Sequence, residues 1–219
     1  NPEIIDTVID SGLPFFISTL LATEKEIDWA VNRIQKRGPS HFAILHGQHT
    51  MMSSGSGVDV SQTTLGYINT LKKRYRVPVG FIDHTPHVWM PAAAAAAGAD
   101  SVCKHLSLSR TDKGPDWQVC LEPDEMKEAV SWARGIRDSS NLKHKKLASG
   151  EDKDRFKMRR SIVATRALRS GDVIKRDAIA FKRPGTGIEP SQYEDIIGKR
   201  VTCDIDENEM LRIDNLKEV

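Results

Sequence analysis

The chain has 219 residues, a net charge of +2 at neutral pH and a charged fraction of 28%. These values describe an ordinary globular protein, and so small a net charge argues against nucleic acid as a partner. The three cysteines have no CxxC spacing, which argues against a disulfide scaffold or a zinc ribbon and fits a reducing, cytoplasmic compartment. We expect no membrane partner, because no apolar run approaches the roughly 20 residues of a membrane-spanning helix.

The first half of the chain predicts four β-strands, each followed by a helix or a loop. Apolar runs place the strands at residues 13–18, 41–45, 77–82 and 101–106. Helical spacing of apolar residues, with capping, Pro and Gly signals at the ends, places helices at residues 1–12, 23–38, 65–75, 91–98 and from 123 onward. Eight such units close a barrel, whereas four suffice only for an open sheet. Because the chain opens on a helix and without the charged region of a secretory signal, we expect further elements before Asn1 and no signal peptide.

Two of the predicted strands end in a histidine. His84 follows the run Val79–Asp83, and His105 follows the run Ser101–Lys104, one βα unit later. The carboxyl ends of parallel strands are where α/β folds bind ligands and metals, so we predict that the two imidazoles converge on one cation. A lone histidine at a strand end is more often a hydrogen-bonded structural residue than a ligand, and for His46 we favour a role in the loop or at the rim.

The composition changes between residues 139 and 157, where Lys, Asp and Glu crowd a segment with few apolar residues. We interpret this segment as a solvated, charged linker rather than a binding patch. From residue 158 onward, short apolar runs separated by turns such as Ser170-Gly171-Asp172 predict a compact β-rich domain of about sixty residues, small but able to fold.

Several short segments are spread over nearly the whole chain. Each is a weak signal by itself, whereas their order along the chain is a specific one. In the first part they are Ile17-Ser18-Thr19, Ala22-Thr23, Leu45-His46, Pro78-Val79-Gly80, Asp83-His84-Thr85, Lys104-His105, Gly114-Pro115-Asp116 and Leu121-Glu122-Pro123-Asp124-Glu125. In the tail they are Arg159-Arg160-Ser161 and Arg183-Pro184-Gly185-Thr186-Gly187-Ile188. In these segments the chain resembles the sialic acid synthase family, which includes the pseudaminic, legionaminic and spore-coat polysaccharide synthases.

The resemblance implies an α/β fold, the C-terminal half of a TIM (β/α)8 barrel followed by a small β-rich SAF (antifreeze-like) domain. It places the last four βα units of the barrel at residues 1–138, the charged linker at 139–157 and the SAF domain at 158–219.

The resemblance also implies an activity, in which phosphoenolpyruvate condenses with an N-acetylhexosamine to give a nine-carbon 2-keto sugar acid and phosphate. A divalent metal, Mn or Mg, takes part, and the family's two metal histidines match His84 and His105. The sugar-contacting aspartate matches Asp116, and a serine near the phosphate matches Ser18. The tail arginine, which one subunit of a domain-swapped homodimer delivers to the other, matches Arg183.

These residue types suit the chemistry, because a metal polarises the sugar aldehyde as a Lewis acid and an aspartate accepts protons from sugar hydroxyls. Plainer roles are also open. Asp116 can cap a turn after Gly114-Pro115, Arg183 can be a solvated charge and Ser18 a turn residue. Because neighbours in a strand face opposite sides, we expect Lys104 to point away from His105.

The chain departs from the family's pattern around the expected pocket. Ile82 replaces a serine, Cys103 a glutamate and Trp117 a histidine, while 47–52 reads Gly-Gln-His-Thr-Met-Met where the family has a segment with a serine and a tyrosine. His49 in this segment is a candidate to replace a lost substrate contact, although a loop role is the alternative. The family's phosphoenolpyruvate-binding lysines and essential glutamate belong to the first four strands, so we expect this chain alone to be inactive.

Two hypotheses of different classes follow. The first is a divergent synthase of the sialic acid type. The second is a degenerate relative that binds carbohydrate or a partner protein without catalysis, which the pocket substitutions favour. An antifreeze role of the tail alone needs a flat, regular surface, which the sequence does not reveal.

Overall fold

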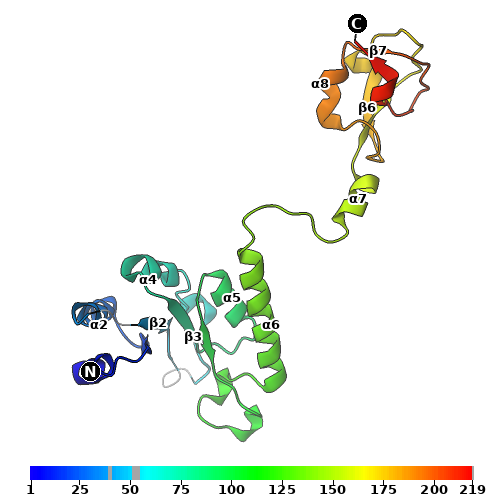
Figure 1. Cartoon of the computed structure of the whole chain (residues 1–219). Coiled ribbons are helices and arrows are strands. Elements are labelled where there is room, and N and C mark those ends of the chain that lie inside the picture. The colour runs from blue at the N-terminus through cyan, green and yellow to red at the C-terminus, as the bar shows by residue number, and fades with distance from the viewer. Residues whose placement is uncertain (39–40, 51–54, 219) are drawn as a thin grey trace. The chain divides into compact units, whose positions relative to one another are not determined.

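The computed structural model describes residues 1–38, 41–50 and 55–218. The chain divides into two compact units, Asn1–Lys143 and His144–Val219 (Figure 1). The segment 139–157, predicted to be a linker, contains the end of one helix and all but the last residue of α7 (Glu151–Met158). Every described residue of α7 is exposed or half-buried, as its charged sequence leads one to expect.

The first unit is built on four parallel strands in the order in which they occur in the chain. They are β1 (Phe15–Ser18), β2 (Phe42–Gly47), β3 (Val79–Asp83) and β4 (Val102–Lys104). The four predicted strands are confirmed, each beginning one or two residues later than predicted, while β2 and β3 run slightly further and β4 ends two residues earlier. Because all strands run the same way, their carboxyl ends lie at one edge of the sheet.

Helices follow the strands in the alternation that the apolar spacing predicted. They are α1 (Pro2–Asp10), α2 (Glu24–Lys36), α4 (Tyr67–Tyr75), α5 (Met90–Ala96) and α6 (Pro123–Ser140). The side chain of Asn1 accepts hydrogen bonds from two amides of the first turn of α1, and Thr23 and Glu26 form a capping box on α2. Local capping thus sets where these helices begin.

The two faces of this sheet differ in burial. Phe42, Ile44, Val79 and Phe81 face the helices and form the core with the apolar sides of α2, α4 and α5. On the other face Phe16 is 65% exposed and Cys103 is exposed. The sheet therefore has a helix-covered face and an open face. A strand that is buried on both sides in a closed barrel reads as continuously apolar, as Phe15–Ile17 of β1 and Phe42–Leu45 of β2 do.

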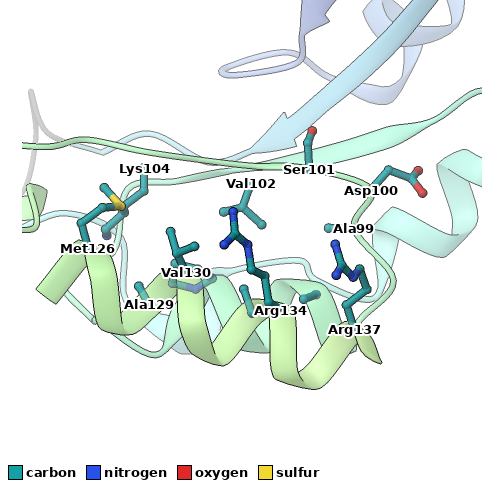
Figure 2. A pocket seen from close by; sticks show the side chains of 13 residues that line it. Ala99, Asp100, Ser101, Val102, Lys104, Met126, Ala129, Val130, Arg134 and Arg137 are labelled. Carbon is teal, nitrogen blue, oxygen red and sulfur yellow. The ribbon is translucent and has the colours of Figure 1, made fainter. Parts of the chain in front are cut away.

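A groove lies between β4 and α6 on the helix-covered face. Val102 and Lys104 line it from the strand, and Met126, Ala129 and Val130 line it from the helix (Figure 2). Lys104 therefore lies on the side of β4 away from Cys103, as strand alternation requires.

The second unit contains two short antiparallel sheets. One pairs β5 (Ser161–Ala164) with β6 (Ile179–Lys182), and the other pairs β7 (Arg200–Val201) with β8 (Leu216–Lys217), with α8 (Tyr193–Ile196) between. Buried aliphatic side chains, among them Ile162, Leu168 and Leu211, form its core. Helix α7 belongs to this unit, since the amide of Gly185 donates to the carbonyl of Phe156 at 2.8 Å.

Among the described helices, none is both long enough and apolar enough to cross a membrane.

Candidate metal centre

His84 and His105 meet at the carboxyl edge of the sheet. Asp83 of β3 pairs in register with Lys104 of β4, so the next residue on each strand is a histidine at the same level. Their Nε2 atoms lie 3.1 Å apart, with the ring centroids 5.0 Å apart. The structure thus brings together the two side chains predicted to bind a metal.

Asp116 reaches the same place from the loop that follows β4. Its Oδ2 lies 3.7 Å from Nε2 of His105. The loop is fixed because the amide of Leu121 donates to the carbonyl of His105 at 2.9 Å, closing it back onto the strand end. Within the loop the amide of Val119 donates to the carbonyl of Asp116 at 3.0 Å. The carboxylate therefore faces the imidazoles rather than only capping a turn.

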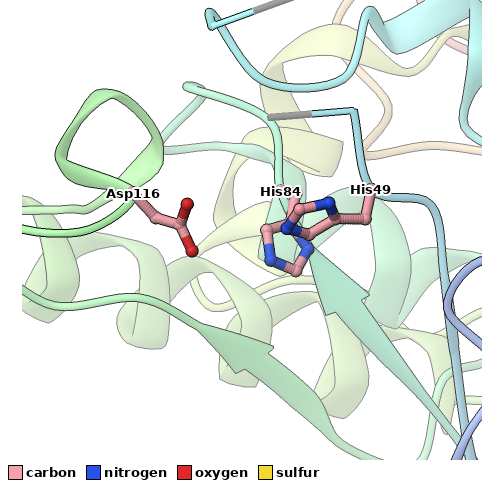
Figure 3. Close-up of side chains that lie close together, drawn as sticks. All are labelled: His49, His84 and Asp116. Atoms are coloured by element: carbon pink, nitrogen blue, oxygen red, sulfur yellow. The ribbon is translucent and has the colours of Figure 1, made fainter. Parts of the chain in front are cut away.

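A third imidazole, His49, joins the cluster from the segment after β2. Its ring centroid lies 4.6 Å from that of His84, and the two rings meet at 71°. One ligand atom each from His49, His84 and Asp116 lie within 4.8 Å of one another, and Figure 3 shows the Asp116 carboxylate directed toward the two rings. We predicted His49 as a substrate contact, and its neighbourhood with His84 went unnoticed. The register of β2 with β3 decides it, because Gly47 pairs with Ile82 and His49 and His84 each follow two residues later.

His84 is suited to donate a lone pair. The residue is 5% exposed, and its Nδ1 has no hydrogen-bond partner among the described residues. Burial, together with the positive charges that His105 and His49 carry when protonated, lowers the pKa of His84 to about 4. The ring is therefore neutral at neutral pH, as a metal ligand must be.

The donor set fits a divalent cation. Two imidazole nitrogens that face each other at 3.1 Å need either a proton or a cation between them. Imidazoles with one carboxylate are ligands that transition metals accept readily. The residues present thus form a possible His/Asp metal site.

On the opposite face of the same two strands, Asp83 and Lys104 form an ion pair at 3.0 Å. Their side chains are 0% and 3% exposed. The Lys104 ammonium also donates to the carbonyl of Thr85, and the amide of Thr85 donates to Oδ1 of Asp83 at 2.8 Å. Burial lowers the pKa of Lys104, which the neighbouring Asp83 carboxylate opposes. The pair ties the end of β3 to the end of β4 directly below the two histidines.

The segment after β2 is held against the end of β3 by a close backbone approach. The amide of Val58 donates to the carbonyl of His84 at 2.8 Å, and the hydroxyl of Thr50 donates to the carbonyl of Gly57 at 2.8 Å. Gly57 has φ +87°, and a Cβ there would lie 2.5 Å from the oxygen of His84. Only glycine fits between this segment and the strand. The resulting bonds hold Thr50, the residue after His49, near the end of β3.

The remaining predicted residues lie elsewhere. Ser18 ends β1, two strands from β3, where its exposed hydroxyl accepts from the amide of Leu20 at 3.3 Å. Arg183 belongs to the second unit, is exposed, and donates through Nε to the carbonyl of Met158 at 3.0 Å. The structure of the first unit therefore assembles His49, His84, His105 and Asp116 and does not bring Ser18 to them.

His46 lies buried within β2 rather than in the loop or rim position that we favoured for it. Its Nδ1 lies 3.2 Å from the hydroxyl of Thr19 and its Nε2 lies 2.7 Å from the hydroxyl of Thr64. The ring is buried on the helix-covered face beside Phe81, and burial lowers its pKa. Both nitrogens have partners, so none is directed to a ligand.

Comparison with known proteins gives two family matches. The NeuB family model matches residues 1–145 and the SAF domain model matches residues 159–217. The N,N'-diacetyllegionaminic acid synthase of Campylobacter jejuni is 30% identical over 198 residues, which are 90% of this chain and 58% of that protein. The chain thus spans a little over half the length of such relatives.

Two solved structures are similar. The N-acetylneuraminic acid (sialic acid) synthetase of Leptospira borgpetersenii, in complex with citrate, is 30% identical with a TM-score of 0.60, over 69% of this chain and 52% of that one. A spore coat polysaccharide biosynthesis protein of Bacillus subtilis is 24% identical with a TM-score of 0.58, over 99% of this chain and 64% of that one, and supports the fold alone.

Proposed function

Because this chain belongs to the NeuB family and carries a SAF domain, we propose that it is part of a synthase that condenses phosphoenolpyruvate with an N-acetylhexosamine such as N-acetylmannosamine. The products are a nine-carbon 2-keto sugar acid and phosphate. Similarity to synthases of legionaminic and sialic acids supports sugar-acid synthesis as the class of reaction. The single observation that carries the proposal is the approach of His84, His105 and Asp116 at the carboxyl edge of the sheet.

In this proposal His84 and His105 hold a divalent metal, Mn or Mg. When bound, the metal polarises the aldehyde of the open-chain sugar as a Lewis acid. Neutral imidazoles suit this role, and burial with the neighbouring His105 and His49 lowers the pKa of His84 to about 4. Asp116 accepts protons from sugar hydroxyls and so orients the sugar beside the two rings.

The other two residues are assigned by resemblance. Ser18 donates its hydroxyl to an oxygen of the phosphate, at the same edge of the sheet as the histidines. Arg183, delivered by the partner subunit of a domain-swapped homodimer, holds a carboxylate or acyl oxygen with its planar guanidinium. Among the described residues, the Arg183 side chain donates one hydrogen bond, from Nε to the carbonyl of Met158. Its terminal guanidinium nitrogens are therefore available to a ligand.

The test is phosphate release. We expect the 219-residue chain by itself to bind Mn²⁺ without turnover, since the implied lysines and glutamate lie in four further βα units. Fusing the chain to the matching N-terminal part of the Leptospira synthetase should restore phosphate release from phosphoenolpyruvate with N-acetylmannosamine. Asp116→Ala in the fusion should remove at least about 99% of the rate, a loss of the size that a positioning group gives. His144→Ala, at an exposed site of the second unit, is the matched control and should be silent.

A second function is favoured by three particular side chains. Ile82 and Cys103 form a register pair on the open face directly below the histidines, where the family has a serine and a glutamate, and Trp117 follows Asp116. An apolar side chain and a thiol cannot accept and donate as those groups do. A degenerate relative that binds carbohydrate without catalysis would show sugar binding to the fusion, with no phosphate released for any N-acetylhexosamine.

A further inference from the structure

The three imidazoles at the edge of the sheet form one row. Gly47 of β2 pairs with Ile82 of β3, and Ile82 pairs with Cys103 of β4. Two residues beyond each of these stand His49, His84 and His105. Since side chains two residues apart point to the same face of a strand, all three rings rise from the open face.

The spacing of the rings agrees with that geometry. Adjacent strands lie about 4.8 Å apart, so side chains at one level on neighbouring strands are separated by about that distance. The ring centroids are 4.6 Å apart from His49 to His84 and 5.0 Å apart from His84 to His105. His84 is therefore the middle member of a row that spans three consecutive strand ends.

His84 and Asp116 lie close to both of the outer histidines, His49 and His105. On one side, His49, His84 and Asp116 bring one ligand atom each within 4.8 Å of one another. On the other side, Nε2 of His105 lies 3.1 Å from His84 and 3.7 Å from Asp116. A cation beside His84 and Asp116 thus has an imidazole within reach on both sides.

Two hydrogen bonds link the segment that follows His49 with the end of β3. The neighbouring Thr50 donates to the carbonyl of Gly57, and Val58 donates to the carbonyl of His84. Gly57 permits this approach, because a Cβ would meet the oxygen of His84 at 2.5 Å. The half-buried His49 ring is held beside His84 by bonds that join the segment to the end of β3.

We propose that His49 is a third imidazole ligand of the metal centre, so that three histidines and Asp116 make this site selective for a transition metal ion over Mg²⁺. This inference rests on the proposed function, since it concerns the same cation. Imidazole nitrogen suits ions such as Co²⁺, Fe²⁺ and Zn²⁺, whereas Mg²⁺ keeps oxygen ligands and water. Each added nitrogen therefore raises affinity for the former ions and not for the latter. His49 would thus act on the choice of metal rather than on the substrate, the role we first gave it.

The experiment measures metal binding by the 219-residue chain, with Co²⁺ as a probe read from its visible absorption and Mg²⁺ as the competitor. His49→Ala should weaken Co²⁺ binding by about tenfold or more, because loss of a ligand should cost at least as much as loss of an outer partner. Binding of Mg²⁺ should change by less than about twofold. His84→Ala should abolish binding of both ions, and His144→Ala is the matched control. Far-UV circular dichroism of each variant checks that the fold is kept, and His49→Gln repeats the measurement with a side chain closer in size to histidine.

The outcomes separate the two proposals. Co²⁺ binding and spectrum unchanged in His49→Ala but lost in His84→Ala would overturn the role of His49 and leave the proposed function standing. Equal weakening of Co²⁺ and Mg²⁺ would overturn the selectivity. Undiminished Co²⁺ binding in His84→Ala would remove the metal centre itself, and the proposed function with it.

Discussion

The carboxyl ends of β3 and β4 carry two clusters of opposite character on their two faces. On the helix-covered face Asp83 and Lys104 are buried, oppositely charged and 3.0 Å apart, so each neutralises the other. On the open face, one residue later, the Nε2 atoms of His84 and His105 lie 3.1 Å apart, with Oδ2 of Asp116 3.7 Å from His105. The same two strands at nearly the same level thus hold one pair of opposite charges and one pair of like groups whose nitrogens suit a cation.

The difference teaches how a strand pair can serve structure and function together. A buried ion pair gains from excellent geometry and further hydrogen bonds, which the amide and carbonyl of Thr85 provide here. It fixes the register that sets the spacing of the histidines. The two imidazoles join the same strand ends by a single contact between their Nε2 atoms, and Nδ1 of His84 has no hydrogen-bond partner among the described residues.

The largest effect on stability should come from breaking the buried ion pair of Asp83 and Lys104. Lys104→Met leaves the Asp83 carboxylate buried and uncompensated, and we expect a loss of roughly 3–5 kcal/mol in the unfolding free energy of the first unit. Urea denaturation followed by circular dichroism measures it. The double variant Asp83→Asn with Lys104→Met should recover much of the loss, because no buried charge remains. A single-variant loss below about 1 kcal/mol would show that water reaches the pair.

The histidine cluster on the open face should make the stability of the first unit depend on metal. At a Co²⁺ concentration of a hundred times its dissociation constant, binding should raise the unfolding free energy by about 2.7 kcal/mol. Thermal denaturation with and without Co²⁺ measures the change. It should vanish in His84→Ala and persist in His46→Gln, since both nitrogens of His46 are already bonded to threonines. Equal stabilisation of all three proteins would place the bound ion elsewhere.

Gly57 packs closely against the carbonyl of His84 at the end of β3 and against Val119 of the loop after β4, so a single added methyl group tests this contact. Gly57→Ala places a Cβ 2.5 Å from the carbonyl oxygen of His84 and 2.4 Å from Cγ1 of Val119, at φ +87°. We expect a loss of about 2 kcal/mol from strain and overpacking, with weaker Co²⁺ binding. Gly55→Ala is the matched control, because Gly55 also has a positive φ of +65° but no atom within 4 Å of a Cβ. An equal loss in both variants would assign the effect to backbone strain alone.

The smallest effect concerns pH and the buried His46. Its pKa in the folded protein is lowered below the ordinary 6.5, so above that pH both folded and unfolded states hold it neutral. As the pH falls below 6.5, the unfolded chain binds a proton that the folded protein does not, and stability falls. His46→Gln should make stability less dependent on pH in that window, as chemical denaturation at several pH values would detect. An unchanged pH dependence would mean that the folded state accepts the proton.

Much of the first unit could be predicted from local pattern. Apolar runs and capping residues such as Asn1 and Thr23 mark where strands and helices lie, since these preferences act over a few residues. The approach of His84 and His105 also followed, because parallel strands end at one edge. Helix α7 was missed, since its charged face buries little and leaves no apolar period to detect.

The sequence by itself thus determined the order of the elements, the family and two of the clustered histidines. Only the tertiary structure decided that His49 joins them, that Asp116 turns back over His105, and that Asp83 and Lys104 neutralise each other beneath. The reason is physical. A capping box or an apolar stripe is complete within one turn, whereas these contacts depend on the register between strands and on loops held by distant backbone bonds, such as that from Val58 to His84.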